Sequence, residues 1–268
     1  DTLYFDAEDG GSSGRELWAH DTSNVSTWQV ADIRSGASSF PGSLISILAG
    51  DTLYFDAYDG SSGRELWAHD TSNSSTWRVA DINSGSGASD PGYGARTVLV
   101  GDTLYFSAND GSSGRELWAH DTSNASTWRV ATGNGDPRNG ILVGDTLYFS
   151  SGSRLWAHDA SNASTWQVAD INSGSTSGSS PGRFVQILVG DTLYFDAYDS
   201  SGRQLWAHQP GEITSNTPLP ASWETEPPLP AGISISGGTI SGTPSVYANN
   251  QTYTIYANQS GYSTTHEL

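Results

Sequence analysis

Three residue types that commonly contribute to stability or chemistry are missing from this chain. Its 268 residues include no cysteine, no methionine and no lysine. Without cysteine, disulfide bonds, thiol nucleophiles and zinc–thiolate sites are all excluded. Because methionine is missing, Asp1 is not a translation start. We therefore expect a processed chain or a segment of a longer protein.

Positive charge is scarce as well. The chain has 29 acidic residues against 11 arginines, and its formal net charge is −18. Nucleic acids and anionic membranes are bound through basic patches, so we predict that neither is a partner and that the chain does not insert into a membrane. Cations, glycans and other proteins remain as partners. High serine, threonine, glycine and asparagine with few charges favours an extracellular or cell-surface protein.

What the chain does have is a repeat. The pentapeptide Asp-Thr-Leu-Tyr-Phe returns at intervals of 50, 51, 43 and 46 residues, and its five copies begin at Asp1, Asp51, Asp102, Asp145 and Asp191. The sequence Leu-Trp-Ala-His follows every copy. Repeats of about this length are typical of propellers and arrays of small units.

Each repeat is predicted to contain four short strands. An apolar run such as 44–49 or 184–189 meets the pentapeptide across a Gly-Asp dipeptide, which is typical of a two-residue hairpin. The Leu-Trp-Ala-His segment and the following Ser-Thr-Trp segment supply the third and fourth strands. Leu53 and Phe55 lie on one face and Tyr54 on the other, so both faces are expected to be packed. The first unit lacks strand one and the fifth unit stops after strand three.

The segment Gly-Arg-Glu-Leu-Trp-Ala-His-Asp, with a fourth strand ending in Val-Ala-Asp-Ile, resembles the ELWxxDGT repeat proteins. The order of strands and turns is also similar to the propellers of the Tol system. This resemblance covers residues 1–208 and implies a β-propeller of about five four-stranded repeats. It also implies a protein that is not an enzyme, because the family has no established activity. Here Asp-Thr-Ser-Asn replaces Asp-Gly-Thr, so a longer turn is expected after strand three.

Residues 209–268 are predicted to form a second domain, because the aromatic repeat stops there and proline, threonine and isoleucine increase. The segments 229–244 and 253–261 resemble the immunoglobulin-like (Ig-like) domains of bacterial and archaeal surface proteins. The likeness rests on Leu229, Pro230, Gly232, Gly238, Thr239, Ile240, Gly242, Thr243 and Pro244. A full sandwich needs roughly 100 residues. We therefore expect a small, incomplete Ig-like β-sandwich with an open edge.

Paired acidic residues in the loop after strand two suggest a calcium site, because carboxylate oxygens are the ligands that Ca²⁺ prefers. The pairs are Asp6 and Asp9, Asp56 and Asp59, and Asp196 and Asp199. The competing interpretation is that Asp-Gly makes the turn and that the first aspartate caps it. Since the third unit has Ser107 and Asn109 there, we favour the turn and predict no metal site and no cofactor.

Other repeated side chains are interpreted as structural. One histidine per unit, at positions 20, 69, 120, 158 and 208, is expected to hydrogen-bond to a neighbouring blade, and nine of the ten tryptophans are assigned to core and blade-to-blade contacts. Glu16, Glu65 and Glu116 also recur once per unit. No single pair of acids stands out as catalytic, so no catalytic residue is predicted.

Six asparagines stand in N-x-S or N-x-T sequences and are candidate N-glycosylation sites. Four of them occupy the same turn of successive units, and the full set is Asn24, Asn73, Asn124, Asn162, Asn250 and Asn258. The alternative is that asparagine is there only because it favours turns.

Two hypotheses for function remain open. The first is a non-enzymatic structural protein of the cell surface whose copies join head-to-tail into a fibril by donating β-strands, since both end units look unfinished. The second is a propeller that binds or acts on glycans, as an adhesin, lectin or sialidase-like protein. A third possibility is an adhesin domain that belongs to a larger surface protein.

Overall fold

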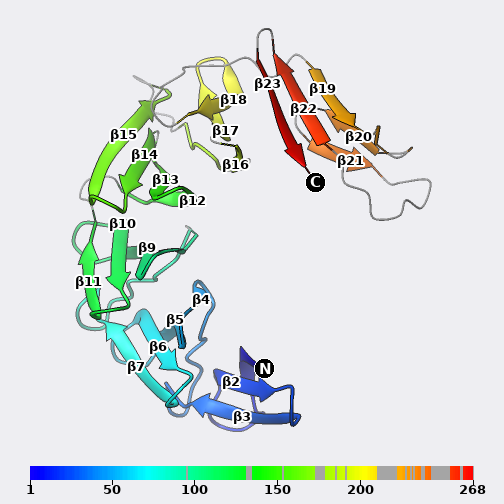
Figure 1. The fold of residues 1–268 in the computed structure, drawn as a ribbon. Coiled ribbons are helices and arrows are strands. Elements are labelled where there is room, and N and C mark those ends of the chain that lie inside the picture. Colours follow the sequence, from blue (N-terminus) through cyan, green and yellow to red (C-terminus); the bar gives the residue numbers. More distant parts are fainter. Residues whose placement is uncertain are drawn as a thin grey trace. The chain divides into compact units, whose positions relative to one another are not determined.

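The described part of the chain is built from β-strands alone, as the computed structural model in Figure 1 shows. The structure describes residues 1–94, 96–130, 135–152, 154–172, 179–184, 186–190 and 192–209. In the C-terminal part it describes residues 222–226, 228–229, 231, 233–236, 239–242, 254–259 and 262–267. Within these residues, no helix has the length and apolar character needed to cross a membrane. The chain divides into two compact units, residues 1–167 and 168–268.

The first unit contains four antiparallel sheets, one for each of the first four repeats. Sheet A has three strands: β1 (Thr2–Glu8), β2 (Arg15–Asp21) and β3 (Ser26–Ala31). Sheet B has four: β4 (Ser46–Ala49), β5 (Thr52–Tyr58), β6 (Arg64–Asp70) and β7 (Ser75–Ala80). Sheet C consists of β8 (Val98–Val100), β9 (Thr103–Asn109), β10 (Arg115–Asp121) and β11 (Ser126–Arg129). Sheet D consists of β12 (Arg138–Val143), β13 (Thr146–Ser151), β14 (Arg154–Asp159) and β15 (Ser164–Asp170), whose end lies in the second unit.

The second unit contains the fifth repeat and the C-terminal segment. Sheet E is formed by β16 (Gln186–Val189), β17 (Thr192–Asp199) and β18 (Gly202–His208). Beyond it, β19 (Ser222–Glu226), β22 (Thr254–Gln259) and β23 (Tyr262–Glu267) form a three-stranded sheet. A separate hairpin joins β20 (Ile233–Ser236) to β21 (Thr239–Gly242).

The predicted all-β architecture of repeated antiparallel sheets is confirmed. In sheet B, Ala49 pairs with Thr52 across the two-residue turn at Gly50, whose φ of 59° lies in the left-handed region that glycine adopts easily. Strand one is shorter than the predicted run 44–49, since β4 begins only at Ser46. The reason is that the N–H groups of Leu44 and Ile45 donate to a side chain, the carboxylate of Asp56.

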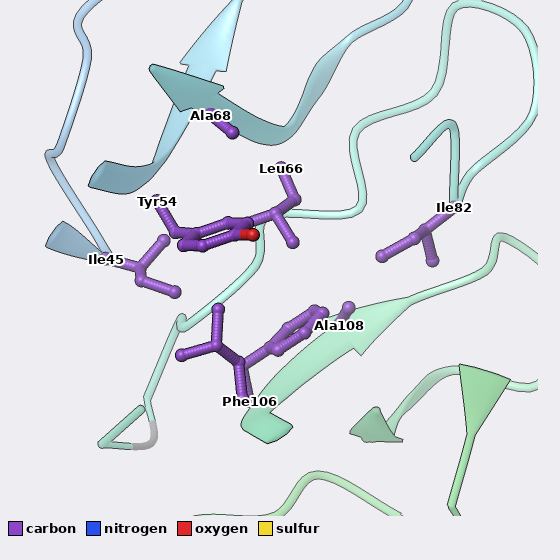
Figure 2. Close-up of a cluster of buried hydrophobic side chains, with 8 residues drawn as sticks. Ile45, Tyr54, Leu66, Ala68, Ile82, Phe106 and Ala108 are labelled. Atoms are coloured by element: carbon purple, nitrogen blue, oxygen red, sulfur yellow. The ribbon is translucent and has the colours of Figure 1, made fainter. Parts of the chain in front are cut away.

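Successive sheets of the first unit pack face to face. Between sheets B and C, a buried cluster combines Ile45, Tyr54, Leu66, Ala68 and Ile82 with Leu104, Phe106 and Ala108 (Figure 2). Ile45 comes from the segment just before β4 and is only 3% exposed. Similar clusters join sheet A to sheet B and sheet C to sheet D. Both faces of a middle sheet are therefore buried, as the apolar residues on both sides of strand two predict.

A buried carboxylate holds the long connection between sheets. Glu65 on β6 is fully buried, and it accepts hydrogen bonds from the backbone N–H groups of Ile82 at 2.9 Å and Ser89 at 3.0 Å, and from the Ser89 hydroxyl at 2.6 Å. Glu16 does the same with Ile33 and Ser39. Burial raises the pKa of the Glu65 carboxyl, while the hydrogen bonds from Ser89 and Ile82 act in the opposite direction.

Glu65→Gln is predicted to lower the free energy of unfolding by about 2–4 kcal/mol. The amide would place an NH₂ donor among backbone N–H donors, so at least one buried donor would lose its acceptor. The matched control is Glu8→Gln, on the exposed end of β1. Chemical denaturation of both variants checks the prediction, and equal stabilities would contradict it.

Candidate functional site

The outer edge of β1 is the candidate site, because sheet A has no described strand at the position that strand one occupies in sheets B to E. In sheets B to E the second strand pairs with strand one on one side and strand three on the other, whereas β1 pairs only with β2 among the described strands. The backbone carbonyl of Asp1 accepts from Thr22 and so faces the β2 side. Backbone groups alternate in a strand, so those of Thr2, Tyr4 and Asp6 face the open edge.

The equivalent edges of the second strands in the other sheets show which groups such an edge binds. In sheet B, the carbonyl of Ser39 accepts from the N–H of Tyr58 at 2.9 Å, and the N–H of Gly42 donates to the Asp56 carbonyl at 2.8 Å. The Asp56 side chain then accepts from the N–H of Leu44 at 2.7 Å and of Ile45 at 2.9 Å through its Oδ1. Arg64 occupies the other carboxylate oxygen, Oδ2.

Asp6 is the counterpart of Asp56 on β1. Its Oδ2 is paired with Arg15, just as that of Asp56 is paired with Arg64. Within the described residues, no N–H group donates to the Oδ1 of Asp6. The carboxylate is therefore already oriented by its arginine, and the oxygen that would receive a strand's N–H groups has no donor.

A cavity of about 180 Å³ lies beside this edge, between sheets A and B. Tyr4, Phe5 and Asp6 of β1 line it together with Leu17 and, from sheet B, Pro41, Gly42, Ser46, Leu53 and Phe55. Leu3 is 60% exposed, whereas its counterpart Leu53 is 8% exposed. The edge therefore combines unpaired backbone groups with an oriented carboxylate.

The acidic loops do not bring calcium ligands together. Asp56 anchors strand one, so the interpretation that it caps the Asp-Gly turn is wrong. The loop is capped by the second aspartate instead: Asp59 accepts from the N–H groups of Ser61 and Ser62 and pairs with Arg78. Asp110 does the same, and its N–H donors Ser113 and Ser112 lower its pKa to about 2. In the described residues, no group of three potential ligands converges on one point.

Three of the repeated histidines, His69, His120 and His158, lie at contacts between sheets. The Nδ1 atom of His69 lies 2.8 Å from the Thr76 hydroxyl of its own sheet, not of a neighbouring blade as predicted. The neighbouring contact is aromatic: the ring of Tyr4 lies 5.4 Å from that of His69. The pairs Tyr54–His120 and Tyr105–His158 repeat it. His20 has the same bond to Thr27, and His208 is buried.

The tryptophans fall into two groups, whereas the sequence predicts a single buried group. Those of the Leu-Trp-Ala-His segment are half-buried or buried, and the most buried that is recorded, Trp206, is 9% exposed. Those of the Ser-Thr-Trp segment are exposed at 40–42%, and they are Trp28, Trp77, Trp128 and Trp166. The assignment of this second group to the core is therefore wrong. The outer strands instead present one large aromatic ring at the same position of each sheet in the first unit.

The first four candidate glycosylation asparagines lie in exposed turns between strands three and four. In sheet B, Asn73 donates to the Asp70 carboxylate at 2.6 Å and accepts from the N–H of Ser75 at 2.9 Å. The middle residue, Ser74, has a φ of 62°. Asn250 lies outside the described residues, and so does the side chain of Asn258. Modification of these six sites stays a prediction.

Comparison with known proteins assigns only the C-terminal part. Residues 197–268 match the family model described as Putative Ig domain, which covers less than half of the chain. No curated protein matches the sequence. The predicted domain boundary between residues 208 and 209, and the resemblance of the repeats to ELWxxDGT proteins, therefore stay predictions.

Several solved structures match the chain at low identity. An oligogalacturonate lyase from Vibrio parahaemolyticus is 10% identical with a TM-score of 0.50, covering 98% of this chain and 74% of the lyase. TolB from Acinetobacter baumannii is 13% identical with a TM-score of 0.39, covering 77% of this chain and 51% of TolB. A puromycin hydrolase is 12% identical with a TM-score of 0.49, covering 76% of this chain and 32% of that protein. The chain thus spans about half of TolB and a third of the hydrolase.

The likeness to the lyase corrects one prediction. The repeat architecture predicts a protein that is not an enzyme, but the oligogalacturonate lyase is an enzyme with a similar fold. The inference from repeat to lack of activity is therefore contradicted. At such identity the likeness shows the fold alone, and it assigns no reaction to this chain.

Sequence reasoning missed the roles of two carboxylates, Asp56 and Glu65, that organise the second repeat. Asp56 and Glu65 recur in the repeat, but they were interpreted as a turn residue and as an unspecified structural acid. The available signal was Ser-x-Pro-Gly, which precedes strand one in several units: Ser39 contacts Glu16, and Ser89 contacts Glu65. Neither partner is close in sequence, so the pairing is visible only in the fold.

The lowered pKa values of three histidines predict that the protein is less stable in acid. Burial lowers the pKa of His69, His120 and His158, so the folded protein takes up their protons less readily than the unfolded chain, whose histidines titrate near 6.5. Their contribution is complete above pH 6.5 and is lost as pH falls toward the lowered values. The free energy of unfolding should therefore decrease between pH 7 and 5.

The variant H69Q/H120Q/H158Q isolates this effect. The variant keeps every carboxylate of the parent. The difference between the two proteins in how the free energy of unfolding changes with pH therefore reports the three histidines alone. We expect a smaller decrease with falling pH in the variant. Parallel pH profiles for the two proteins would contradict the assignment.

Proposed function

We propose that this chain is a structural subunit of an extracellular assembly, whose copies join head-to-tail by β-strand complementation. The open edge of β1 carries the proposal. An exposed strand edge pairs readily with another chain, because its N–H and C=O groups lack partners. A contact that joins two different surfaces, and does not close on itself, extends into a filament.

Three further features support the assembly. Leu3 of β1 is 60% exposed, so sheet A presents apolar surface that a partner could cover. Each repeat forms its own sheet, and the sheets follow one another along the chain. Such a row of sheets can hold two binding surfaces apart without any catalytic centre. The net charge of −18 and the absence of cysteine and lysine fit a protein outside the cell. On this proposal, residues 1–208 belong to an ELWxxDGT-like propeller and the C-terminal segment to an incomplete Ig-like sandwich at the cell surface.

Thr2→Pro is predicted to abolish filaments. Thr2 faces the open edge, so proline removes an N–H group there and places its ring in the path of an incoming strand, while the β1–β2 bonds on the other side remain. Electron microscopy and light scattering of the full chain at rising concentration measure the effect. The control is Thr2→Ala, which keeps the N–H group and should assemble like the parent.

The parent protein gives the decisive result. A chain that stays a monodisperse monomer over the whole concentration range would contradict head-to-tail assembly. Filaments that persist in the Thr2→Pro variant would place the contact elsewhere on the molecule.

A second candidate function is glycan binding, because four tryptophans are exposed at equivalent positions. A flat aromatic ring can stack on the C–H face of a sugar while polar neighbours bind its hydroxyls, and each exposed tryptophan follows Ser-Thr. The acidic chain repels anionic polymers, so the glycan class that fits is neutral.

The combined variant W28A/W77A/W128A/W166A tests this second function. We expect it to lose binding to neutral glycans on an array, and we expect soluble glycan to change the tryptophan fluorescence of the parent. Val25→Ala, an exposed apolar residue of a neighbouring turn, is the matched control. A parent protein that binds no glycan, or a quadruple variant that binds as well as the parent, would rule out the stacking role.

A further inference from the structure

We propose that the peptide bond between Asp90 and Pro91 is a self-cleavage site. The Asp90 carboxylate attacks its own backbone carbonyl, and Arg115 stabilises the negative charge that develops on the carbonyl oxygen. The bond lies in the connection between β7 of sheet B and β8 of sheet C. This activity is independent of the assembly and of glycan binding, because it uses neither the β1 edge nor the exposed tryptophans.

The carbonyl oxygen of Asp90 accepts hydrogen bonds from two N–H donors. The Nη1 atom of Arg115 donates to it at 2.7 Å, and the backbone N–H of Tyr93 donates at 3.2 Å. The Arg115 side chain is only 13% exposed, and its guanidinium lies over the Tyr93 ring, 4.9 Å from the ring centre. Two fixed donors, one of them cationic and shielded from water, are the arrangement that stabilises the oxyanion of a tetrahedral intermediate.

The Asp90 carboxylate is the nucleophile. Its Oδ1 lies 4.0 Å from Nε of Arg64 and its Oδ2 lies 3.8 Å from Nη2 of Arg115, and both distances are longer than a hydrogen bond. Among the described residues, none donates a hydrogen bond to either oxygen. The oxygens are therefore free to attack, and a carboxylate on Cβ reaches the carbonyl carbon of its own residue by closing a small ring, without the entropic cost of bringing two molecules together.

The backbone before the bond is strained. Asp90 has a φ of 45°, in the left-handed region that residues other than glycine rarely adopt, although a following proline favours extended backbone at this position. Ser89 and Pro91 on either side are buried, and Ser89 is held by Glu65, so the surrounding structure maintains the strained conformation. Cleavage of the bond releases this strain.

The equivalent connections show what Asp90 adds. Phe40–Pro41 has nearly the same backbone, with a φ of 50° at Phe40, and Nη1 of Arg64 donates to its carbonyl at 3.0 Å. The bond from arginine to carbonyl is therefore part of the fold, and the carboxylate is the addition. Asp136–Pro137 also has a carboxylate, but Nε and Nη2 of Arg138 hold its Oδ2 at 2.9 and 2.5 Å. Asp90 combines an activated carbonyl with a carboxylate that no hydrogen bond holds.

Water is the co-reactant of the cleavage. A bond forms between a carboxylate oxygen of Asp90 and its carbonyl carbon, and the electron pair of the carbonyl moves to the oxygen held by Arg115. As this oxyanion collapses, the C–N bond to Pro91 breaks, and the proline nitrogen takes a proton from solvent and becomes a secondary amine. Asp90 is left as a cyclic anhydride, which water opens to two carboxyl groups. The products are residues 1–90 and 91–268.

The two products are expected to stay together in the folded protein. The buried cluster between sheets B and C contains Ile45, Tyr54 and Ile82 from before the bond, and Phe106 and Ala108 from after it (Figure 2). Cleavage should therefore leave the native particle intact, and the two fragments should separate only in denaturant.

The test is incubation of the full chain in mildly acidic buffer, followed by mass spectrometry under denaturing conditions. We expect the fragments 1–90 and 91–268 to accumulate at least about tenfold faster in the folded chain than in the chain unfolded by urea, because only the folded chain places Arg115 on the carbonyl. Hydroxylamine added to the buffer should capture the anhydride and leave a hydroxamate at residue 90. Direct hydrolysis by water would leave none there.

Variants separate the roles of the two residues. Asp90→Phe takes the residue of the equivalent position 40, so it should fold like the parent and lose cleavage at residue 90. Arg115→Met should slow cleavage by at least about tenfold, because one oxyanion donor is lost. Arg129→Gln, whose arginine pairs with Asp110, is the control and should cleave like the parent.

Four results would each overturn the proposal. They are a folded chain that yields no fragments, equal cleavage rates in the folded and the unfolded chain, absence of the hydroxamate, and cleavage at the parent rate in Asp90→Phe. Cleavage at the parent rate in Arg115→Met would remove Arg115 from the mechanism. Thermal unfolding of each variant shows whether it is folded, and Asp90→Phe keeps the test decisive if Arg115→Met does not fold.

Discussion

Hydrogen bonding along the second strand of each repeat is the constraint on which the rest of the structure depends. A strand has N–H and C=O groups on two sides, and leaving either side unpaired in an apolar setting is costly. In sheet B, β5 has β4 on one side and β6 on the other, and all its residues except the two ends are buried. In sheet A, β1 has the same sequence motif and one neighbour, and none of its residues is buried. The difference between these strands therefore follows from pairing and neighbouring sheets, because their sequences are nearly the same.

In sheet B, two buried carboxylates allow the chain to enter and leave the sheet without losing backbone partners. Asp56 receives the N–H groups of the segment that enters strand one, and Glu65 receives those of the connection that leaves strand four. A carboxylate can accept several hydrogen bonds at once, which suits loops whose N–H groups point the same way. These two acids thus have structural roles: Asp56 pairs with Arg64 and Glu65 with Ser89, and both accept backbone N–H groups.

Much of the fold could be predicted from the sequence because its signals are local. The Gly-Asp turns, the apolar faces of the pentapeptide and the order of strands in each repeat all depend on neighbours within a few residues. The role of Asp56 and the exposure of Trp77 could not be predicted. Both depend on segments that are distant in sequence and come together only between strands or at the edge of a sheet. The failed inference about enzymatic activity has another origin. It transferred a family property through an architecture that enzymes also have.

Amide hydrogen exchange at the edge of β1 tests the central claim most directly. In dilute solution, the amides of Thr2, Tyr4, Asp6 and Glu8 should exchange much faster than those of Thr52, Tyr54, Asp56 and Tyr58, which occupy the same positions of the paired strand β5. In the assembled protein the two sets should become similarly protected. Slow exchange of the β1 set in the dilute, unassembled chain would contradict the account, because it would mean that the edge already has its partners.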